Sequence, residues 1–183
     1  MREKITLIAL LASSIAFGQL QAPKASPICK LEQTVGLTNI SIVYSRPSKN
    51  DRVVFGEVIK YDEIWRTGAN ENTTFSNSDI LIFDKDTLKP GKYALYTKPM
   101  KGSWDVYFYN ETSNWGTPEK WEENKVALKI NVPSKEVTNV TETFTIDAFV
   151  EKQFTETFVV DSFVRKTDTE TFVIDAFIRE TQS

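Results

Sequence analysis

The chain has 183 residues, with 22 Lys and Arg against 25 Asp and Glu, for a formal net charge of −3. Its 40% hydrophobic and 26% charged residues are typical of a globular domain rather than a disordered or membrane-spanning chain. The absence of His excludes Ser-His-Asp and Cys-His catalysis as well as His-ligated metals. One Cys excludes an intrachain disulfide and a Cys-rich zinc site. We therefore expect no metal ion and no cofactor, and the mildly acidic charge argues against a nucleic-acid partner.

The first 18 residues have the pattern of a secretory signal peptide. Arg2 and Lys4 precede an apolar stretch over residues 5–17, which is too short for a membrane span of ~20 residues. A buried N-terminal helix is the alternative, but the order of charge and apolar residues favours export. We expect cleavage before Gln19 and a mature protein, periplasmic or secreted, that has no membrane span.

The middle of the chain predicts β-strands at a spacing of roughly ten residues. Ile40, Ile42 and Tyr44 alternate with polar or smaller residues, which indicates a half-buried strand. The same kind of pattern, or a short apolar run, predicts strands at 39–45, 79–83, 93–97, 103–109 and 125–132. We expect an all-β fold, an antiparallel β-sandwich-like domain over residues 19–152.

The connections between these strands contain turn residues. Residues 84–86 are a polar turn, 89–92 carry the Pro-Gly pair that a type II turn favours, and 99–102 form a further connection. Residues 55–63 are the best candidate for a single helical turn.

The C-terminal part contains an internal repeat. The string Thr-Glu-Thr-Phe begins at residues 141, 155 and 169, at a constant spacing of 14 residues. Each copy is rich in β-formers, but no Gly, Pro or Asn provides a tight turn. A β-prone tail over 153–183 therefore has two interpretations, a self-associating segment or a duplicated strand. We expect the second copy to pair with the first, and the third to be loosely held or to join another chain.

Two groups of residues are candidates for binding. Arginines at strand ends and turns hold carboxylates or phosphates by bidentate bonds, and exposed aromatics form platforms for sugars. The candidate residues are Arg46, Trp65, Arg66, Thr67, Asn70 and Trp115. The structural alternative is that Trp65 fills core, Arg66 pairs with an internal acid, and the 109–121 aromatics cover an edge. We expect the structural alternative for Arg66, with a loss of about 3–5 kcal/mol in Arg66→Ala.

Six strings of this sequence resemble the secreted bacterial family called domain of unknown function 2911, over about residues 26–146. They are Gln-Thr-Val-Gly-Leu-Thr at 33–38, Tyr-Ser-Arg-Pro at 44–47, Phe-Gly at 55–56, Ile-Trp-Arg-Thr-Gly-Ala-Asn at 64–70, Pro-Gly-Lys-Tyr-Ala-Leu-Tyr-Thr at 90–97 and Asn-Trp-Gly at 114–116. The resemblance implies an exported single-domain β-sandwich-like protein and implies no activity. It implies that Arg46 and residues 65–68 and 70 are the family's signature.

The resemblance ends where the repeats begin. Family members usually continue after a segment like 142–146 with a further strand that carries a Leu-rich run and a Trp-Glu pair. Here the 14-residue copies stand in that place, so either the second copy supplies the strand or the sheet keeps an open edge.

Three functions remain open from the sequence. The first is a non-catalytic binding or structural module of the periplasm or cell surface, whose ligand is a small molecule or glycan. The second is an enzyme that uses carboxylates or arginine on a sugar or anionic small molecule. The third is self-association through the repeats.

Overall fold

The computed structural model describes residues 22–83, 85–135, 140–151 and 155–161. These ranges contain ten β-strands, and the helical structure within them is one 3-10 turn, η2 (Glu123–Lys125). The strands are β1 Ile28–Val35, β2 Thr38–Ser45, β3 Thr73–Asn77, β4 Leu81–Phe83, β5 Asp86–Leu88, β6 Gly91–Met100, β7 Ser103–Tyr109, β8 Val126–Pro133, β9 Thr145–Glu151 and β10 Thr155–Asp161.

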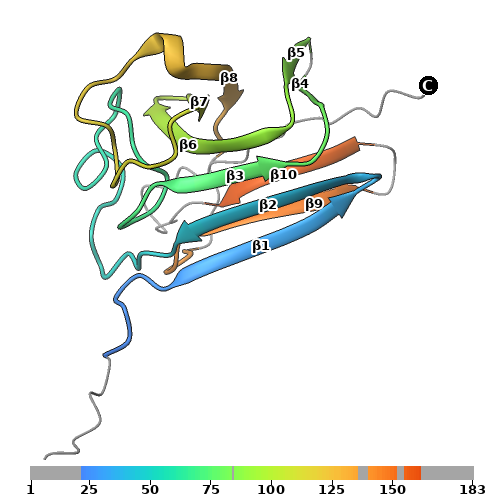
Figure 1. The fold of residues 1–183 in the computed structure, drawn as a ribbon. Helices are drawn as coiled ribbons and strands as arrows, with labels where there is room; N and C mark the ends of the chain where they lie inside the picture. Colours follow the sequence, from blue (N-terminus) through green and yellow to red (C-terminus); the bar gives the residue numbers. More distant parts are fainter. Residues whose placement is uncertain (1–21, 84, 136–139, 152–154, 162–183) are drawn as a thin grey trace, which may run out of the picture.

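Six strands form one antiparallel sheet in the order β1-β2-β3-β6-β7-β8 (Figure 1). The β4–β5 hairpin is inserted between β3 and β6 in the chain, and β9 pairs with β10 in a separate two-stranded sheet. All of these pairings are antiparallel. The predicted all-β, sandwich-like fold is confirmed.

The main core lies against one face of the six-stranded sheet. The predicted alternation in β2 is confirmed, because Ile40, Ile42 and Tyr44 are all buried. Phe144 and Ile146, at the start of β9, pack into the same core. The β4–β5 hairpin and the chain between β2 and β3 contribute the remaining cover, Leu81, Phe83, Leu88, Val54 and Ile59.

The opposite face of the sheet is covered over β6 and β7. Tyr96, Tyr107 and Tyr109 are buried there, and Trp121 from the connection to β8 packs against all three rings. Trp121 stacks on Tyr109 with ring centroids 4.6 Å apart. Both faces of β7 are therefore buried at Tyr107 and Tyr109, which is why these two outward residues are aromatic rather than polar.

Some local predictions were wrong. Residues 55–63 form turns and an isolated bridge between Phe55 and Ile59 instead of a helical turn. Gly91 begins β6 without the positive φ that a type II turn needs. Residues 99–102 are not all connection, since β6 continues to Met100. Pairing with β3 ends at Leu95, so Pro99 has a strand on one side only, where a missing N–H is tolerated.

The first two repeat copies are partners, as expected. β9 pairs with β10 from Thr145 opposite Asp161 to Glu151 opposite Thr155. The third copy and the predicted signal peptide lie outside the described residues. No helix in the described ranges is long and apolar enough to cross a membrane.

Candidate binding site

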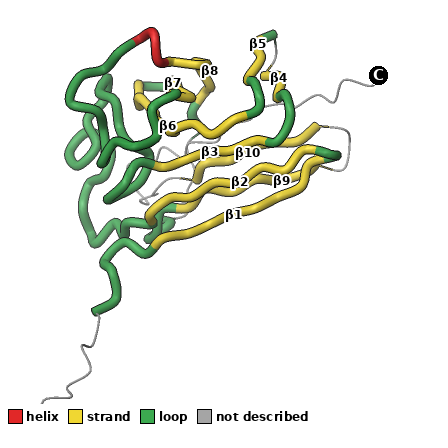
Figure 2. Tube along the Cα trace, viewed as in Figure 1, coloured by secondary structure: helices red, strands yellow, loops and turns green. Residues whose placement is uncertain are grey.

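The long loops meet at one end of the sheet (Figure 2). One is the chain between β2 and β3, and the other is the chain between β7 and β8. Gly68 lies where the first loop contacts the end of β2, and Gly116 lies where the second loop contacts the first. A Cβ on Gly68 would lie 3.0 Å from the carbonyl oxygen of Ser45, and a Cβ on Gly116 would lie 2.8 Å from Nη1 of Arg66. Three strings of the family resemblance, at 44–47, 64–70 and 114–116, therefore converge in space.

Trp65 and Thr67 anchor this region to the sheet. The backbone of Trp65 exchanges two hydrogen bonds with Thr97, at 2.7 and 2.9 Å, and its indole N–H donates to the Gly68 carbonyl oxygen at 3.1 Å. Thr67 is fully buried, with its Oγ1 3.0 Å from Oγ1 of Thr97. The Trp65 ring packs edge-on against Trp104. These contacts match the structural alternative for Trp65, and they place Thr67 in the fold as well.

Three residues of the 64–70 string have a positive φ, namely Thr67, Gly68 and Asn70. Gly68, at φ 152°, passes so close to β2 that a side chain there would crowd the Ser45 carbonyl oxygen and strain the backbone. Asn70, at φ 59°, donates from its amide to the carbonyl oxygen of Ser26 at 3.4 Å. Asn70 thus fixes the chain before β1 to the loop.

The guanidinium of Arg46 is hydrogen-bonded to other residues of the chain. Its Nε donates to the Phe144 carbonyl oxygen at 3.1 Å, and its Nη2 donates to Oγ1 of Thr145 at 2.9 Å. The two candidate arginines therefore do not act as a pair, because Arg46 points at the start of β9.

The surroundings of Arg66 differ from those that we expected from the sequence. No carboxylate of the described residues lies within ion-pair distance of it, and its Nε is buried without a hydrogen-bond acceptor. The guanidinium lies against Gly116. The internal acid that the sequence led us to expect is absent from the described part, so the reason for a large stability loss in Arg66→Ala is absent too.

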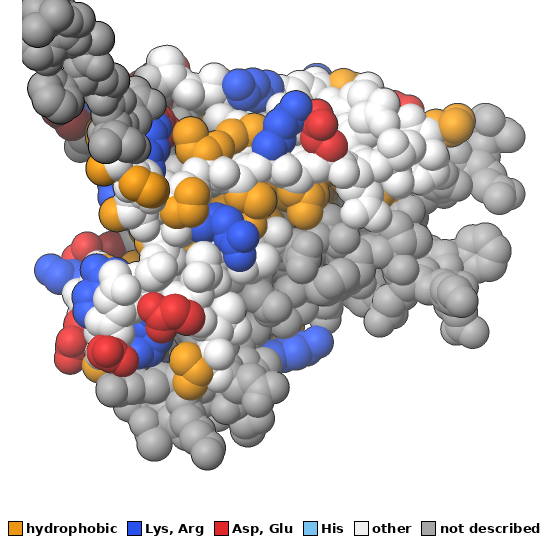
Figure 3. Space-filling view, turned by 90° about the horizontal axis from the view of Figure 1, so that it is seen from below, with side chains coloured by type: hydrophobic (Ala, Val, Ile, Leu, Met, Phe, Trp, Pro, Cys, Tyr) orange, Lys and Arg blue, Asp and Glu red, His pale blue; other side chains and the backbone are white. Residues whose placement is uncertain are grey.

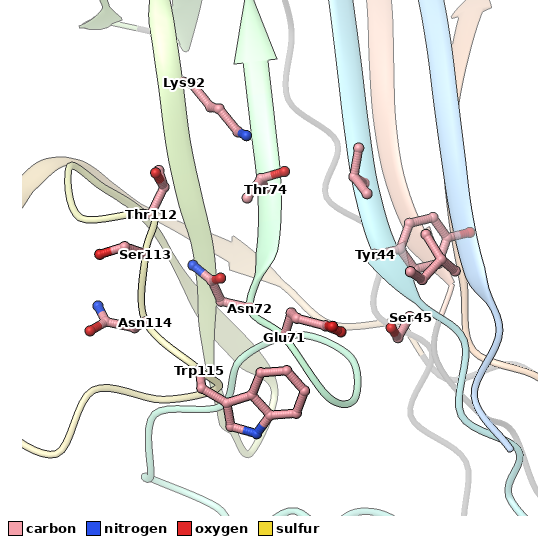
Figure 4. A pocket seen from close by; sticks show the side chains of 12 residues that line it. Tyr44, Ser45, Glu71, Asn72, Thr74, Lys92, Thr112, Ser113, Asn114 and Trp115 are labelled. Carbon is pink, nitrogen blue, oxygen red and sulfur yellow. The ribbon is translucent and has the colours of Figure 1, made fainter. Parts of the chain in front are cut away.

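Trp115 borders a groove of about 400 Å³ on the outer side of the sheet (Figure 4). The side chain is 72% exposed. Strand residues form the floor and residues 112–114 form a wall. The polar residues that line the groove with Trp115 are Ser45, Glu71, Asn72, Thr74, Lys92, Thr112, Ser113 and Asn114.

Asn72 is a buried amide at the base of this groove. It is 7% exposed, and its Nδ2 has no hydrogen-bond acceptor among the described residues. The amide points toward the 112–114 wall (Figure 4). A buried donor without an acceptor costs free energy.

Tyr96 lies beneath the same wall. Its hydroxyl donates to the Gly116 carbonyl oxygen at 3.1 Å. Burial raises the pKa of Tyr96, and the nearby amides of Asn114 and Asn72 oppose that rise. The Asn72 amide is thus close enough to affect the pKa of the hydroxyl without reaching hydrogen-bond geometry with it. The Tyr96 hydroxyl stays protonated and supports the loop that carries Trp115.

Another acidic residue, Asp105, is held by several polar contacts but does not line the Trp115 groove. Asp105 on β7 is buried and accepts hydrogen bonds from Asn131 and Tyr107, and it pairs with Lys129 at 2.9 Å. Burial alone would raise the pKa of Asp105, but Lys129 and Asn131 outweigh it and hold the pKa below its ordinary value. Its partners all come from the sheet, so this cluster is structural. The described ranges hold no group of three or more acidic or Cys side chains placed to bind a metal.

The structure thus separates the candidate residues. Trp115 is exposed at the groove, Arg66 lies behind it, and the other four hold the loops in place. The proposed 109–121 platform is divided, since Trp121 and Tyr109 cover the sheet while Trp115 does not. Sequence reasoning missed Glu71, Asn72 and Lys92. The first two directly follow the 64–70 string, but nothing in the sequence linked Lys92 to it.

Comparison with known proteins gives one match. No curated protein and no solved structure matches the chain. The family model described as "Protein of unknown function (DUF2911)" matches residues 26–160, which cover β1 to nearly the end of β10. The match ends at residue 160, so it includes the start of the second repeat copy, beyond the end of the resemblance seen in the sequence. The chain belongs to the DUF2911 family.

Proposed function

We propose that this protein is a non-catalytic binding module that acts in the periplasm or outside the cell and holds a glycan in the Trp115 groove. The basic, apolar and small-residue order of residues 1–18 supports export. Export is tested by the intact mass of the protein from the extracytoplasmic fraction. The proposal expects a chain that begins at Gln19 or within a few residues of it, and a retained Met1 would contradict it.

The observation that carries the binding proposal is the exposure of Trp115. The indole is 72% exposed beside a groove, and Trp is enriched at binding surfaces because it combines a large apolar ring with a polar N–H. The indole offers a flat apolar face, which suits the C–H face of a sugar ring. The backbone next to Trp115 is fixed by the hydrogen bond from Tyr96 to Gly116 and by the contact of Gly116 with Arg66, so part of the loop is ordered before a ligand arrives.

The polar lining supports a polyhydroxylated ligand. Glu71 offers acceptors, Lys92 offers donors, and Asn72 and Asn114 offer amides that do both. Charges of both signs are present and most of the lining is neutral, so a ligand with many hydroxyls matches it better than a strongly charged one.

The same lining argues against hydrolysis of the glycan. Glycosidases of the common type need two carboxyl groups about 5–9.5 Å apart across the cleft. Glu71 is the single carboxylate among the described residues that line this groove. We therefore assign Glu71 to hydrogen bonding and not to acid catalysis.

Calorimetric titration of the mature protein tests the proposal. The probes are cello-, xylo-, chito-, manno- and malto-oligosaccharides. At least one should bind, and Trp115→Ala should weaken that binding tenfold or more, since removal of a central aromatic contact costs about 2 kcal/mol or more. Leu37→Ala is the matched control, because Leu37 is 92% exposed and outside the groove. If none of the five classes binds, or if Trp115→Ala binds equally well, the proposal is wrong.

A further inference from the structure

A second cavity lies on another side of the 64–70 string. Its volume is about 520 Å³, and it shares no lining residue with the Trp115 groove. The walls come from the chain before β1, the chain after β2 and the loop that carries Trp65 and Arg66. Two arginines line it, Arg52 and Arg66, and the described residues that line it include no Asp or Glu.

The charge of Arg66 is not compensated within the described ranges. Its Nε is buried without an acceptor, and no carboxylate lies within ion-pair distance. A cation held in this way favours an anion from outside, because the pairing replaces solvation that burial has removed.

Arg52 is held in place by its own loop. Its Nε donates to the Lys49 carbonyl oxygen at 2.9 Å, and its Nη2 donates to the Ser48 carbonyl oxygen at 2.6 Å. Carbonyl oxygens carry no net charge, so the positive charge of Arg52 remains. Three acids adjoin lining residues without lining the cavity themselves: Asp51, Glu57, and Glu142, whose Oε1 accepts from the backbone N–H of Asn50 at 2.8 Å. Among the described residues that line the cavity, the two arginines are therefore not matched by a carboxylate.

The rest of the lining is largely apolar. Val54 and Ile59 are buried, Val58 is 51% exposed, and the partly buried Trp65 completes the wall. A small inorganic anion would leave these side chains in contact with water. An anion with a hydrocarbon body would cover them, and apolar surface removed from water contributes roughly 25 cal/mol per Å².

We propose that this cavity binds an organic carboxylate with an apolar body, whose carboxylate pairs with Arg52 and Arg66 and whose hydrocarbon part lies on the valine, isoleucine and tryptophan wall. Arginine is suited to the head group because its planar fork matches the two oxygens of a carboxylate. The proposal does not depend on the glycan groove.

Calorimetric titration of the mature protein with octanoate and phenylacetate tests it, with octanamide and inorganic phosphate as comparison ligands. At least one carboxylate should bind about tenfold or more tightly than both comparison ligands. Arg52→Gln and Arg66→Gln should each weaken carboxylate binding about tenfold, the effect of losing one charge-assisted contact. Lys85→Gln, which removes one exposed positive charge outside the cavity, should leave binding unchanged.

Each alternative outcome overturns the proposal. Equal binding of octanamide would mean a plain apolar cavity, and equal binding of phosphate would mean a plain anion site. No binding of either carboxylate would mean that neither description of the ligand is right. Circular dichroism checks the fold of both arginine variants, and exposed Arg52 decides the test if Arg66→Gln does not fold.

Discussion

Arg46 holds the start of β9 by donating from its Nε to the carbonyl oxygen of Phe144 at 3.1 Å. The contact is reinforced in the opposite direction, since the Phe144 N–H donates to the Pro47 carbonyl oxygen at 3.0 Å. Phe144 itself is fully buried. The Tyr-Ser-Arg-Pro string therefore fastens the small sheet to the large one, and its arginine serves the fold.

Replacement of Arg46 by Ala should lower the free energy of unfolding by about 2–3 kcal/mol, because a charge-assisted hydrogen bond is worth about 1.5–3 kcal/mol and a buried carbonyl loses its donor. Urea unfolding followed by fluorescence measures the loss. Lys85→Ala, which removes an exposed charge, is the control. A loss under about 0.5 kcal/mol, the usual range of surface substitutions, would show that Arg46 does not hold the two sheets together.

Gly68→Ala should be more destabilising than Gly102→Ala. Both positions have a positive φ, 152° and 80°, so both substitutions carry backbone strain of order 1 kcal/mol or more. A Cβ at Gly68 also meets the Ser45 carbonyl oxygen at 3.0 Å, whereas a Cβ at Gly102 meets nothing within 4 Å. Thermal unfolding of the two variants compares them directly. Equal midpoints would mean that the close approach of the loop to β2 is relaxed at no cost.

Some strands of this fold could be predicted from the sequence, and others could not. Strands with strong alternation, such as β2 and β7, were predictable because each residue's face follows from its position. β3 was missed because its sequence, Thr-Thr-Phe-Ser-Asn, has one large apolar residue. Its polar side chains Thr74 and Ser76 face outward, so a strand in the middle of the sheet looks like a loop.

The site was less predictable than the fold. Trp115 was named from its string alone, and its exposure agrees with a binding role. Arg46 and Arg66 look alike in the sequence, each beside a turn residue. Their different surroundings depend on Phe144 and Gly116, which are far away in the chain, and no local pattern distinguishes such contacts. Lys92 joins the groove through sheet pairing, which sequence spacing did not reveal.

Tyr44→Phe should reduce stability in a pH-dependent way. The hydroxyl accepts from the Ile146 N–H at 3.0 Å and donates to its carbonyl oxygen at 3.3 Å, so its loss should cost about 1–3 kcal/mol at neutral pH. Burial raises the pKa of Tyr44 to about 12, from an ordinary value near 10. Between these values the unfolded chain releases a proton that the folded chain keeps, so stability falls as pH rises.

The difference in stability between wild type and Tyr44→Phe should therefore shrink as the pH rises from 10 to 12. Urea unfolding at neutral pH and at several pH values in that window gives the comparison. Other buried tyrosines are common to both proteins and do not affect the difference. A difference that stays constant across the window would contradict the raised pKa.

Truncation of the chain should separate the second repeat copy from the third. Deletion of residues 155–183 removes β10, the partner of β9, and leaves the backbone groups of an edge strand unpaired. We expect aggregation, measured by light scattering. Deletion of residues 169–183 keeps β10 and should leave the fold intact with reduced association. If the longer deletion stays monomeric and equally stable, β9 needs no partner and the argument from the open edge is wrong.

The binding role of Trp115 is the central claim, and nuclear magnetic resonance of the indole N–H groups tests it most directly. The chain has four Trp residues, each with its own signal. The indoles of Trp65 and Trp121 donate to Gly68 and Glu123, so their environments are already fixed. On titration with an oligosaccharide that binds, the Trp115 signal should move and those of Trp65 and Trp121 should stay. Binding that leaves the Trp115 signal unmoved, or that moves Trp121 instead, would contradict the account.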